Sequence, residues 1–357
     1  MTLRICAPDI FSGDAVGNHC LGIARMAERL GWEVQIYARH FDVASRAIND
    51  IEALYADLRE EDTLLLSYSI FDPNLDTLLA LRCRKVCYFH GITSPELLRE
   101  FEPRTADLCE QAIGQLPRLA AFDTVVANSR FSANCLPAGV STTSVVVIPP
   151  VFADMPAFAE GQTQAACASR DINLLMVGRV VPHKRIEDAI DVLANLVKRD
   201  INVSLSVVGS VPNYDYTKFL LNRARALGVL ERIDFTGMVD DADLSAAFDR
   251  ASALLSLSRH EGFCVPALEA MHVGMPVFVR GGTATEEICP PDSVLAAEAD
   301  AAAWADVICA RLDELERTNP SNNRYVEKAD EILQRTRDSI WQSVLERVPS
   351  GDVHVRA

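Results

Sequence analysis

Short apolar runs rich in β-branched residues alternate with segments of helical length along this chain, and the alternation occurs twice. In the first half the runs cover residues 3–7, 33–38, 63–67, 85–89, 124–127 and 144–148. Ala15 to Leu30 has the periodicity of an amphipathic helix, and Gly31 after it suits a left-handed helix cap. This order predicts βαβ units, in which a parallel sheet carries helices on both faces.

The pattern stops at Pro149 and Pro150 and starts again at Ile172. The second set of runs covers residues 172–177, 203–208, 233–235, 253–257 and 276–279, with helical segments at 185–198, 214–227, 243–248 and from Pro266 onward. A mostly helical stretch follows at 301–345. The second half therefore predicts a second doubly wound α/β domain.

We expect two Rossmann-like domains that face each other across a cleft, because 357 residues exceed the roughly 100–200 of one ordinary domain. The expected boundaries are an N-terminal domain at 1–155, a linker at 156–170, a C-terminal domain at 171–325 and a helical segment at 326–357 that can pack back on the N-terminal domain. Open α/β sheets bind ligands beyond the carboxyl ends of their strands, so the cleft is the expected ligand site.

Charge and composition argue against several classes of protein. The formal net charge of -16 disfavours a nucleic-acid-binding protein, since such domains are usually basic. No apolar stretch reaches the about 18 residues of a membrane-spanning helix, and the N-terminus has no signal-peptide pattern, so we expect a cytoplasmic protein. Ten cysteines without a Cys-x-x-Cys pair indicate reduced, buried thiols.

The strongest local motif is the stretch 259–270, RHEGFCVPALEA. A strand ends just before it, and Pro266 stands where the first turn of a helix should begin. A helix N-terminus carries about +0.5 charge and unpaired N–H donors. We therefore predict a diphosphate-binding site at the loop formed by Gly262, Phe263 and Cys264.

Two glutamates bracket this loop. Glu269 is suited to accept hydrogen bonds from ribose hydroxyls, and Glu261 from a sugar on the other side of the phosphates. Either glutamate alone is better explained as a partner of the helix dipole or as a solvent-facing side chain. Only their combination with other motifs favours a binding role.

The loop 178–184, GRVVPHK, supplies the second motif. Arg179 and Lys184 are two cations after the strand 172–177, and Gly178 opens the loop. We expect both cations on an exposed loop at the carboxyl end of that strand, where they would neutralise a phosphate. Solvent-exposed loop charge is the plain alternative.

The first half carries weaker signals. Gly13 and Asp14 follow the first strand and open the first helix, where a glycine lets the backbone approach a ligand, although a tight turn explains the pattern equally well. His90 follows the strand 85–89, again at a carboxyl end. The motifs G-x-G-x-x-G, G-x-x-x-x-G-K-[ST], G-x-S-x-G and H-E-x-x-H do not occur, which argues against a typical dinucleotide fold, a P-loop, an α/β-hydrolase and a zinc protease.

With these motifs in this order, the chain resembles the retaining GT-B glycosyltransferases of glycosyltransferase family 4, the group 1 glycosyltransferases of bacterial polysaccharide synthesis. The resemblance rests on the stretches 178–184, 235–244 and 261–277 and covers the second domain. In the first domain it is looser, with Gly13 and His90 in family-like places and the strand 125–128 leading to Ser129.

The resemblance implies a role for each motif residue. Arg179 and Lys184 would bind the donor diphosphate, Glu269 the ribose and Glu261 the donor sugar. Further contacts would come from the loops of both domains, with the backbone of Met238 and Val239 meeting the base, and His90 lying near the reacting centre. The departure is Cys264, where relatives often carry a second glycine.

The expected function is transfer of a hexose or deoxyhexose from a GDP- or UDP-sugar to a glycan or lipid-linked acceptor, with retention of configuration. No cofactor and no divalent metal are expected, because Arg179 and Lys184 supply the positive charge. The acceptor would bind around the loop 91–96, and peripheral contact with the inner face of the cell membrane stays open, with Arg82, Arg84 and Lys85 as the compact basic cluster. The alternatives are an inverting transferase or a nucleotide-sugar epimerase with His19 as general base, and a nucleotide-sugar-binding protein without turnover.

Overall fold

The computed structural model describes residues 1–11, 14–42, 46–141, 145–151, 172–317 and 324–346. The chain divides into two compact units. Unit 1 comprises Met1–Gly91, Gly114–Ala153 and Leu333–Ala357, and unit 2 comprises Ile92–Ile113 and Asp154–Ile332. The predicted linker at 156–170 lies outside the described residues.

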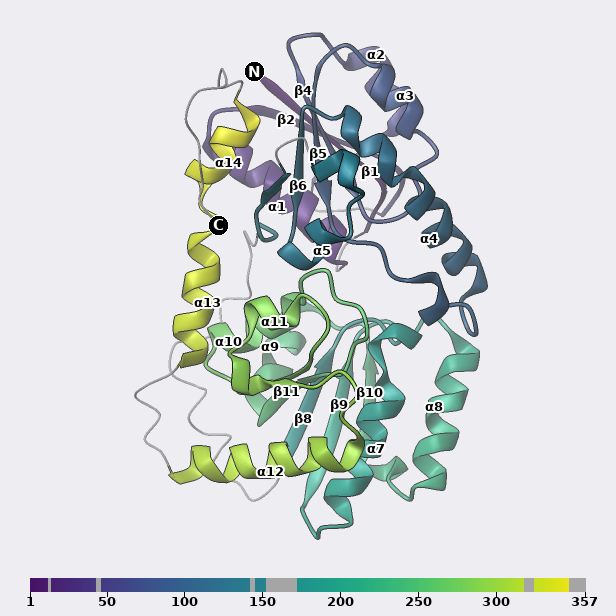
Figure 1. Ribbon diagram of the computed structural model, residues 1–357, viewed down its shortest axis with the longest axis vertical. Helices are drawn as coiled ribbons and strands as arrows, with labels where there is room; N and C mark the ends of the chain where they lie inside the picture. Colours follow the sequence, from purple (N-terminus) through teal and green to yellow (C-terminus); the bar gives the residue numbers. More distant parts are fainter. Residues whose placement is uncertain (12–13, 43–45, 142–144, 152–171, 318–323, 347–357) are drawn as a thin grey trace. The chain divides into compact units, whose positions relative to one another are not determined.

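Unit 1 is built on a parallel sheet of seven strands (Figure 1). In spatial order the strands are β3 (Asn49–Asp50), β2 (Glu33–Phe41), β1 (Thr2–Ile10), β4 (Thr63–Tyr68), β5 (Arg84–Phe89), β6 (Thr124–Ala127) and β7 (Val145–Val147). The helices are α1 (Ala15–Arg29), α2 (Ile51–Asp57), α3 (Leu75–Ala80), α5 (Arg130–Asn134), α6 (Ala138–Ser141) and α14 (Asp338–Leu345). The strand order reverses between β1 and β4, the doubly wound pattern that the alternation predicts.

Helix α1 illustrates how the sequence sets an element's limits. Asp14 caps its start by accepting from the Gly17 N–H at 2.6 Å, and Gly31 after its end has φ +85°, a left-handed conformation that glycine adopts without strain. Its apolar stripe packs on the sheet, where Leu3, Ile5 and Ile36 are fully buried. The helix predicted at residues 15–30 is therefore confirmed.

The C-terminal helix α14 completes the core of unit 1. It lies beside α1 (Figure 1), and Arg29 Nε donates to Asp338 Oδ2 at 2.8 Å. Trp341 is fully buried against Tyr88. Residues 338–345 thus belong to unit 1, whereas α13 (Arg324–Gln334) belongs mostly to unit 2.

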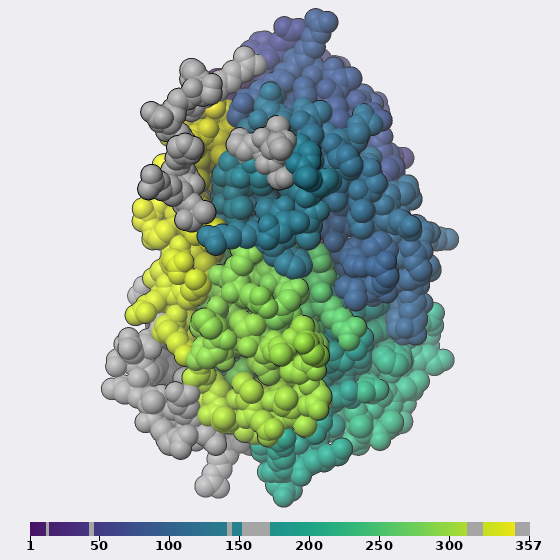
Figure 2. Space-filling view, viewed as in Figure 1, coloured from purple at the N-terminus to yellow at the C-terminus, as the bar shows by residue number. Residues whose placement is uncertain are grey.

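Unit 2 has a parallel sheet of six strands in the order β10 (Ile233–Gly237), β9 (Val203–Val208), β8 (Ile172–Val177), β11 (Ala253–Ser256), β12 (Val277–Arg280) and β13 (Val294–Leu295). Its other helices are α4 (Pro103–Gln115, mostly in this unit), α7 (Ile186–Val197), α8 (Tyr214–Ala226), α9 (Asp241–Arg250), α10 (Val265–His272), α11 (Thr285–Ile288) and α12 (Ala301–Arg317). Helix α7 packs against both α8 and α12. On the side shown in Figure 2, the chain from α10 to α12, coloured green to yellow-green, forms part of the outer surface of unit 2, and teal residues form the rest beside it.

Residues 92–113 group with unit 2, which differs from the predicted N-terminal domain at 1–155. The Phe101 ring lies 5.1 Å from that of Tyr216 and 5.6 Å from that of Phe219, measured between ring centroids. Asn213 Nδ2 also donates to the Phe101 carbonyl at 2.6 Å. These contacts tie the segment to α8, although it lies between β5 and β6 in the sequence.

The strand order of unit 2 reverses between β8 and β11. The loops after these two neighbouring strands therefore meet at one edge of the sheet, the place where open α/β sheets bind ligands. Within the described part of the chain, no helix has both the length and the apolar character needed to cross a membrane.

Candidate functional site

The loop after β8 begins with a close approach of two backbones. Gly178 has φ +141°, and its N–H donates to the Val208 carbonyl at 2.8 Å. A Cβ on Gly209 would lie 2.2 Å from the Gly178 carbonyl oxygen, so only glycine fits at Gly209. The carboxyl ends of β8 and β9 are thus drawn together beneath the loop that carries Arg179 and Lys184.

Lys184 ends a short 3₁₀ turn, Pro182–Lys184, just before α7. Its Nζ donates to Glu261 Oε1 at 2.7 Å, and the two side chains are 23% and 10% exposed. Burial lowers the pKa of Lys184, but the charge and hydrogen bond of Glu261 outweigh burial, so the net pKa is raised. Lys184 is therefore a charged, half-buried ammonium, and the expectation that it lies on an exposed loop is wrong.

The loop after β11 is bound to its neighbours through the backbone. The Arg259 N–H donates to the His183 carbonyl at 2.8 Å, and the Ala284 N–H donates to the Glu261 carbonyl at 3.2 Å. The first of these bonds joins the Lys184 turn directly to the loop that carries Glu261. The two motifs, which are separate in the sequence, are thus joined in the structure.

Cys264 ends this loop in the left-handed region, with φ +74°, and caps α10. That backbone conformation favours glycine, the residue that the family resemblance leads us to expect at this position. Burial raises the pKa of the Cys264 thiol to about 12, so it is neutral at physiological pH. Helix α10 begins at Val265, so Pro266 is its second residue. The predicted start of the helix at Pro266 is therefore one residue too late.

A pocket at the carboxyl ends of β8 and β11 brings the main predicted residues together. Its lining includes Gly178, Arg179, Lys184, Glu261 and Cys264. Arg179 is exposed, and no described residue pairs with its guanidinium. Its charge opposes that of Lys184 and acts to lower the Lys184 pKa, so the two cations lie near each other. The pocket can therefore present two positive charges to an anion.

Glu269, Met238 and Val239 do not line that pocket. Burial raises the pKa of Glu269 to about 7, with a smaller contribution from the charge of Asp241. No described residue donates a hydrogen bond to this carboxylate. Met238 is 70% exposed and lies three positions before Asp241, whose charge acts on Glu269.

The remaining loop residues of the motif are packed inside unit 2 instead of lining the pocket. Phe263 is 4% exposed and Gly262 is half-buried. Both make further contacts within the chain.

The predicted residues of unit 1 occupy different local settings. Gly13 lies outside the described residues, while Asp14 caps α1 and Ser129 caps α5 by accepting from the Ser132 N–H at 3.0 Å. His90 Nε2 lies 2.7 Å from Ser67 Oγ. Burial lowers the pKa of His90 to about 3, so its ring is neutral at physiological pH. A neutral ring held by one nitrogen is suited to hydrogen bonding rather than to proton transfer.

His19, the general base of the alternative readings, is 1% exposed. The Val151 N–H donates to His19 Nδ1 at 3.1 Å, and burial lowers the pKa of the ring well below its usual value. The imidazole also stacks on Tyr88, with centroids 3.9 Å apart. These contacts make His19 part of the core of unit 1.

Two features bear on expectations about metals and membranes. The metal-free expectation took the sequence to lack an Asp-x-Asp, which is wrong: Asp241-Ala242-Asp243 is one, and it lies exposed in the first turn of α9. In the basic cluster, Arg84 Nη2 donates to the Val344 carbonyl at 2.7 Å and Lys85 Nζ to the Leu81 carbonyl at 2.8 Å. Both cations are thus engaged within unit 1.

Comparison with known proteins gives a family match in the second half. Residues 162–331 match the family model described as "Glycosyl transferases group 1". The chain is 31% identical over 173 residues to a glycogen synthase of Mycobacterium tuberculosis. The matched region covers 48% of this chain and 40% of that protein.

A second relative from the same organism is a GDP-mannose-dependent alpha-(1-6)-phosphatidylinositol dimannoside mannosyltransferase. It is 29% identical over 218 residues, covering 57% of this chain and 55% of that protein. The chain spans about half the length of the curated relatives that it matches.

Among solved structures, HepE of Anabaena in complex with UDP and glucose superposes with a TM-score of 0.70. The sequences are 17% identical, and the match covers 96% of this chain and 98% of HepE. At this identity the likeness shows the fold, that of the GT-B proteins with two parallel-sheet, Rossmann-like domains.

Proposed function

We propose that this chain, whose residues 162–331 match the family model of the group 1 glycosyltransferases, transfers a hexose or deoxyhexose from a nucleoside-diphosphate sugar to a glycan or lipid-linked acceptor. The proposed transfer retains the configuration at the anomeric carbon and serves bacterial surface polysaccharide synthesis. The protein would work in the cytoplasm, with peripheral contact at the inner face of the cell membrane.

One observation carries the proposal: Arg179, Lys184 and Glu261 line a single pocket at the switch point of the unit 2 sheet. A diphosphate leaving group gains negative charge as the glycosidic bond breaks. Preorganised cations aimed at that charge stabilise the transition state more than the ground state. Arg179 and Lys184 are the cations in this role.

The donor nucleotide has its own contacts in the proposal. Glu269 would accept from the ribose hydroxyls, and the backbone of the Met238–Val239 loop would meet the base. Because one relative is named for GDP-mannose and HepE was solved with UDP, GDP- and UDP-sugars are the proposed donors.

The chemistry needs no obligatory side-chain base. As charge develops on the leaving phosphate oxygen, that oxygen can take the proton of the acceptor hydroxyl. The acceptor then attacks the anomeric carbon from the side on which the phosphate leaves, so the configuration is retained. Glu261 would contact the donor sugar, and His90, neutral and held by Ser67, would donate or accept a hydrogen bond near the reacting centre. No divalent metal is part of the proposed mechanism.

Ligand binding followed by turnover tests the proposal. Thermal denaturation with GDP, UDP, dTDP and ADP should single out one nucleotide, since a ligand at about 100 times its Kd stabilises the folded state by about 2.7 kcal/mol. The matching sugar nucleotide, offered with a panel of acceptors, should give a product whose anomer is read by NMR. An inverted product would contradict retention, and binding without transfer or hydrolysis would favour a non-catalytic protein.

A further inference from the structure

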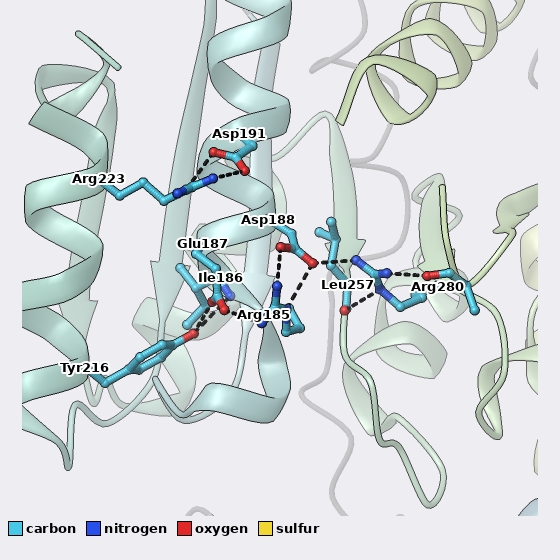
Figure 3. A network of polar contacts seen from close by, with 10 residues as sticks. Arg185, Ile186, Glu187, Asp188, Asp191, Tyr216, Arg223, Leu257 and Arg280 are labelled. Atoms are coloured by element: carbon cyan, nitrogen blue, oxygen red, sulfur yellow. Dashed lines mark hydrogen bonds and ion pairs between the residues drawn. The ribbon is translucent and has the colours of Figure 1, made fainter. Parts of the chain in front are cut away.

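A buried arginine beside the pocket joins three separate segments of unit 2 (Figure 3). Arg280, at the carboxyl end of β12, is 5% exposed. Its Nε donates to the Leu257 carbonyl at 2.8 Å, its Nη2 donates to Asp188 Oδ2 at 2.6 Å, and its Nη1 donates to the Ala297 carbonyl. One guanidinium therefore fixes the distances between three pieces of chain.

Two of these three segments carry the charged residues of the pocket. Leu257 opens the loop that leads to Glu261, four positions later. Asp188 lies in the first turn of α7, four positions after Lys184. Arg280 and Asp188 do not line the pocket themselves.

Asp188 is held from a second side by the residue that follows Lys184. Arg185 Nη2 donates to Asp188 Oδ1 at 2.8 Å and Arg185 Nε to Asp188 Oδ2 at 3.1 Å. Arg185 has φ +54°, a left-handed conformation that is uncommon outside glycine. The fork between Arg185 and Asp188 thus holds the bend at which the Lys184 turn enters α7.

We propose that Arg280 and Asp188 are positioning residues that keep the Lys184 turn and the Glu261 loop in the register needed to bind a diphosphate. The inference rests on the proposed function, because it assigns these residues to the same donor site. Arg280 suits this task because its planar guanidinium presents five donors in a rigid fork. A lysine keeps the charge but cannot hold all three acceptors in the same directions.

The same helix offers a matched control pair. Asp191 lies on α7, three positions after Asp188, and accepts from Arg223 Nε at 2.7 Å and from Arg223 Nη2 (Figure 3). The Arg223 side chain is 40% exposed and comes from α8, which contributes nothing to the pocket lining. This pair has the same residue types as Arg280 and Asp188, and no bond of it to either pocket loop is found among the described residues.

The experiment compares Arg280→Lys and Asp188→Asn with Arg223→Lys and Asp191→Asn in the full chain. Binding of UDP and GDP is measured by calorimetry, and hydrolysis of UDP-glucose and GDP-mannose gives kcat and KM, at a temperature at which every variant is folded. Arg280→Lys and Asp188→Asn should each lower kcat by about 10²-fold, the effect of misplacing a catalytic group by about 1 Å. The control pair should leave kcat, KM and Kd at wild-type values.

A rescue experiment guards against a simple folding defect. Arg280→Ala should regain part of its lost kcat when guanidinium is added at a concentration that leaves the wild-type protein unaffected, whereas Arg223→Ala should not respond. A lower melting temperature alone would not produce this difference.

The outcomes separate the two proposals. If the wild-type chain binds neither nucleotide and hydrolyses neither sugar nucleotide, the proposed function fails and this inference falls with it. If the wild-type chain is active and Arg280→Lys and Asp188→Asn match it in kcat and Kd, or if the control pair loses as much, only the positioning role is overturned.

Discussion

Lys184 Nζ donates to Glu261 Oε1 at 2.7 Å, although the two residues are 77 positions apart and follow different strands. An ammonium has three N–H donors, so Lys184 can keep Glu261 as a partner while it binds a phosphate oxygen. The carboxylate therefore holds the cation in place and charged before any ligand arrives. The two residues should be tested as a pair.

Replacing Lys184 by Ala should lower both catalysis and stability. Loss of one preorganised donor at a developing negative charge should cut kcat by about 10²–10³-fold. Because the carboxyl group of Glu261 would lose its hydrogen-bond partner in a largely buried place, we also expect a loss of about 1–3 kcal/mol in the free energy of unfolding. Steady-state kinetics and urea denaturation measure the two effects.

Arg179→Ala is the control for this prediction. Arg179 is exposed and pairs with no described residue, so its loss should reduce kcat similarly but change stability by only about 0.5 kcal/mol or less. Equal stability losses in the two variants would show that the ion pair contributes nothing to folding.

Glu261→Ala should lower turnover and leave the affinity for the free nucleoside diphosphate little changed. The proposed partner of Glu261 is the donor sugar, which the free diphosphate lacks. Calorimetry with the diphosphate and kinetics with the sugar nucleotide distinguish the two contributions. A large loss of diphosphate affinity would instead assign Glu261 to holding Lys184 alone.

The sequence allowed the sheets and the pocket edge to be predicted because these depend on local patterns. The run Ile172–Val177 is a strand with the predicted bounds, since its apolar residues are bounded by the turn-forming Gly178. Parallel strands that flank a switch point bring their following loops together. The placement of Arg179, Lys184 and Glu261 at one edge was therefore within reach of sequence reasoning.

Long-range contacts lay beyond that reasoning. No local pattern marks Phe101 as a partner of α8, so the grouping of residues 92–113 with unit 2 could not be predicted. The exposure expected for Lys184 was wrong for the same reason, because its burial depends on a carboxylate from another loop. The bonds of Arg280 to Leu257 and Asp188 likewise join segments that are far apart in the chain.

Activity should survive excess EDTA, because Arg179 and Lys184 supply the positive charge that a metal would otherwise bring to the diphosphate. The rate of sugar transfer is measured before and after chelation, with and without added Mg²⁺ or Mn²⁺. The Asp-x-Asp at Asp241–Asp243 provides the control, since Asp243→Asn should leave activity unchanged. Transfer that depends on added metal and is lost in Asp243→Asn would refute the metal-free mechanism.

Glu269 should make nucleotide binding and stability depend on pH near neutrality. Its pKa is raised from the usual 4.5 to about 7, mainly by burial, so the folded chain binds more protons than the unfolded chain between these values. The contribution of Glu269 to stability therefore falls as pH rises through this window, and Glu269→Gln should remove that fall.

Ribose hydroxyls donate to the charged carboxylate of Glu269, so affinity for the nucleoside diphosphate should rise as pH increases through about 7. Because the terminal phosphate of the ligand titrates nearby, calorimetry at each pH must include Glu269→Gln, which should bind more weakly and show only the titration of the ligand. Identical pH profiles for the wild type and Glu269→Gln would remove Glu269 from the nucleotide site.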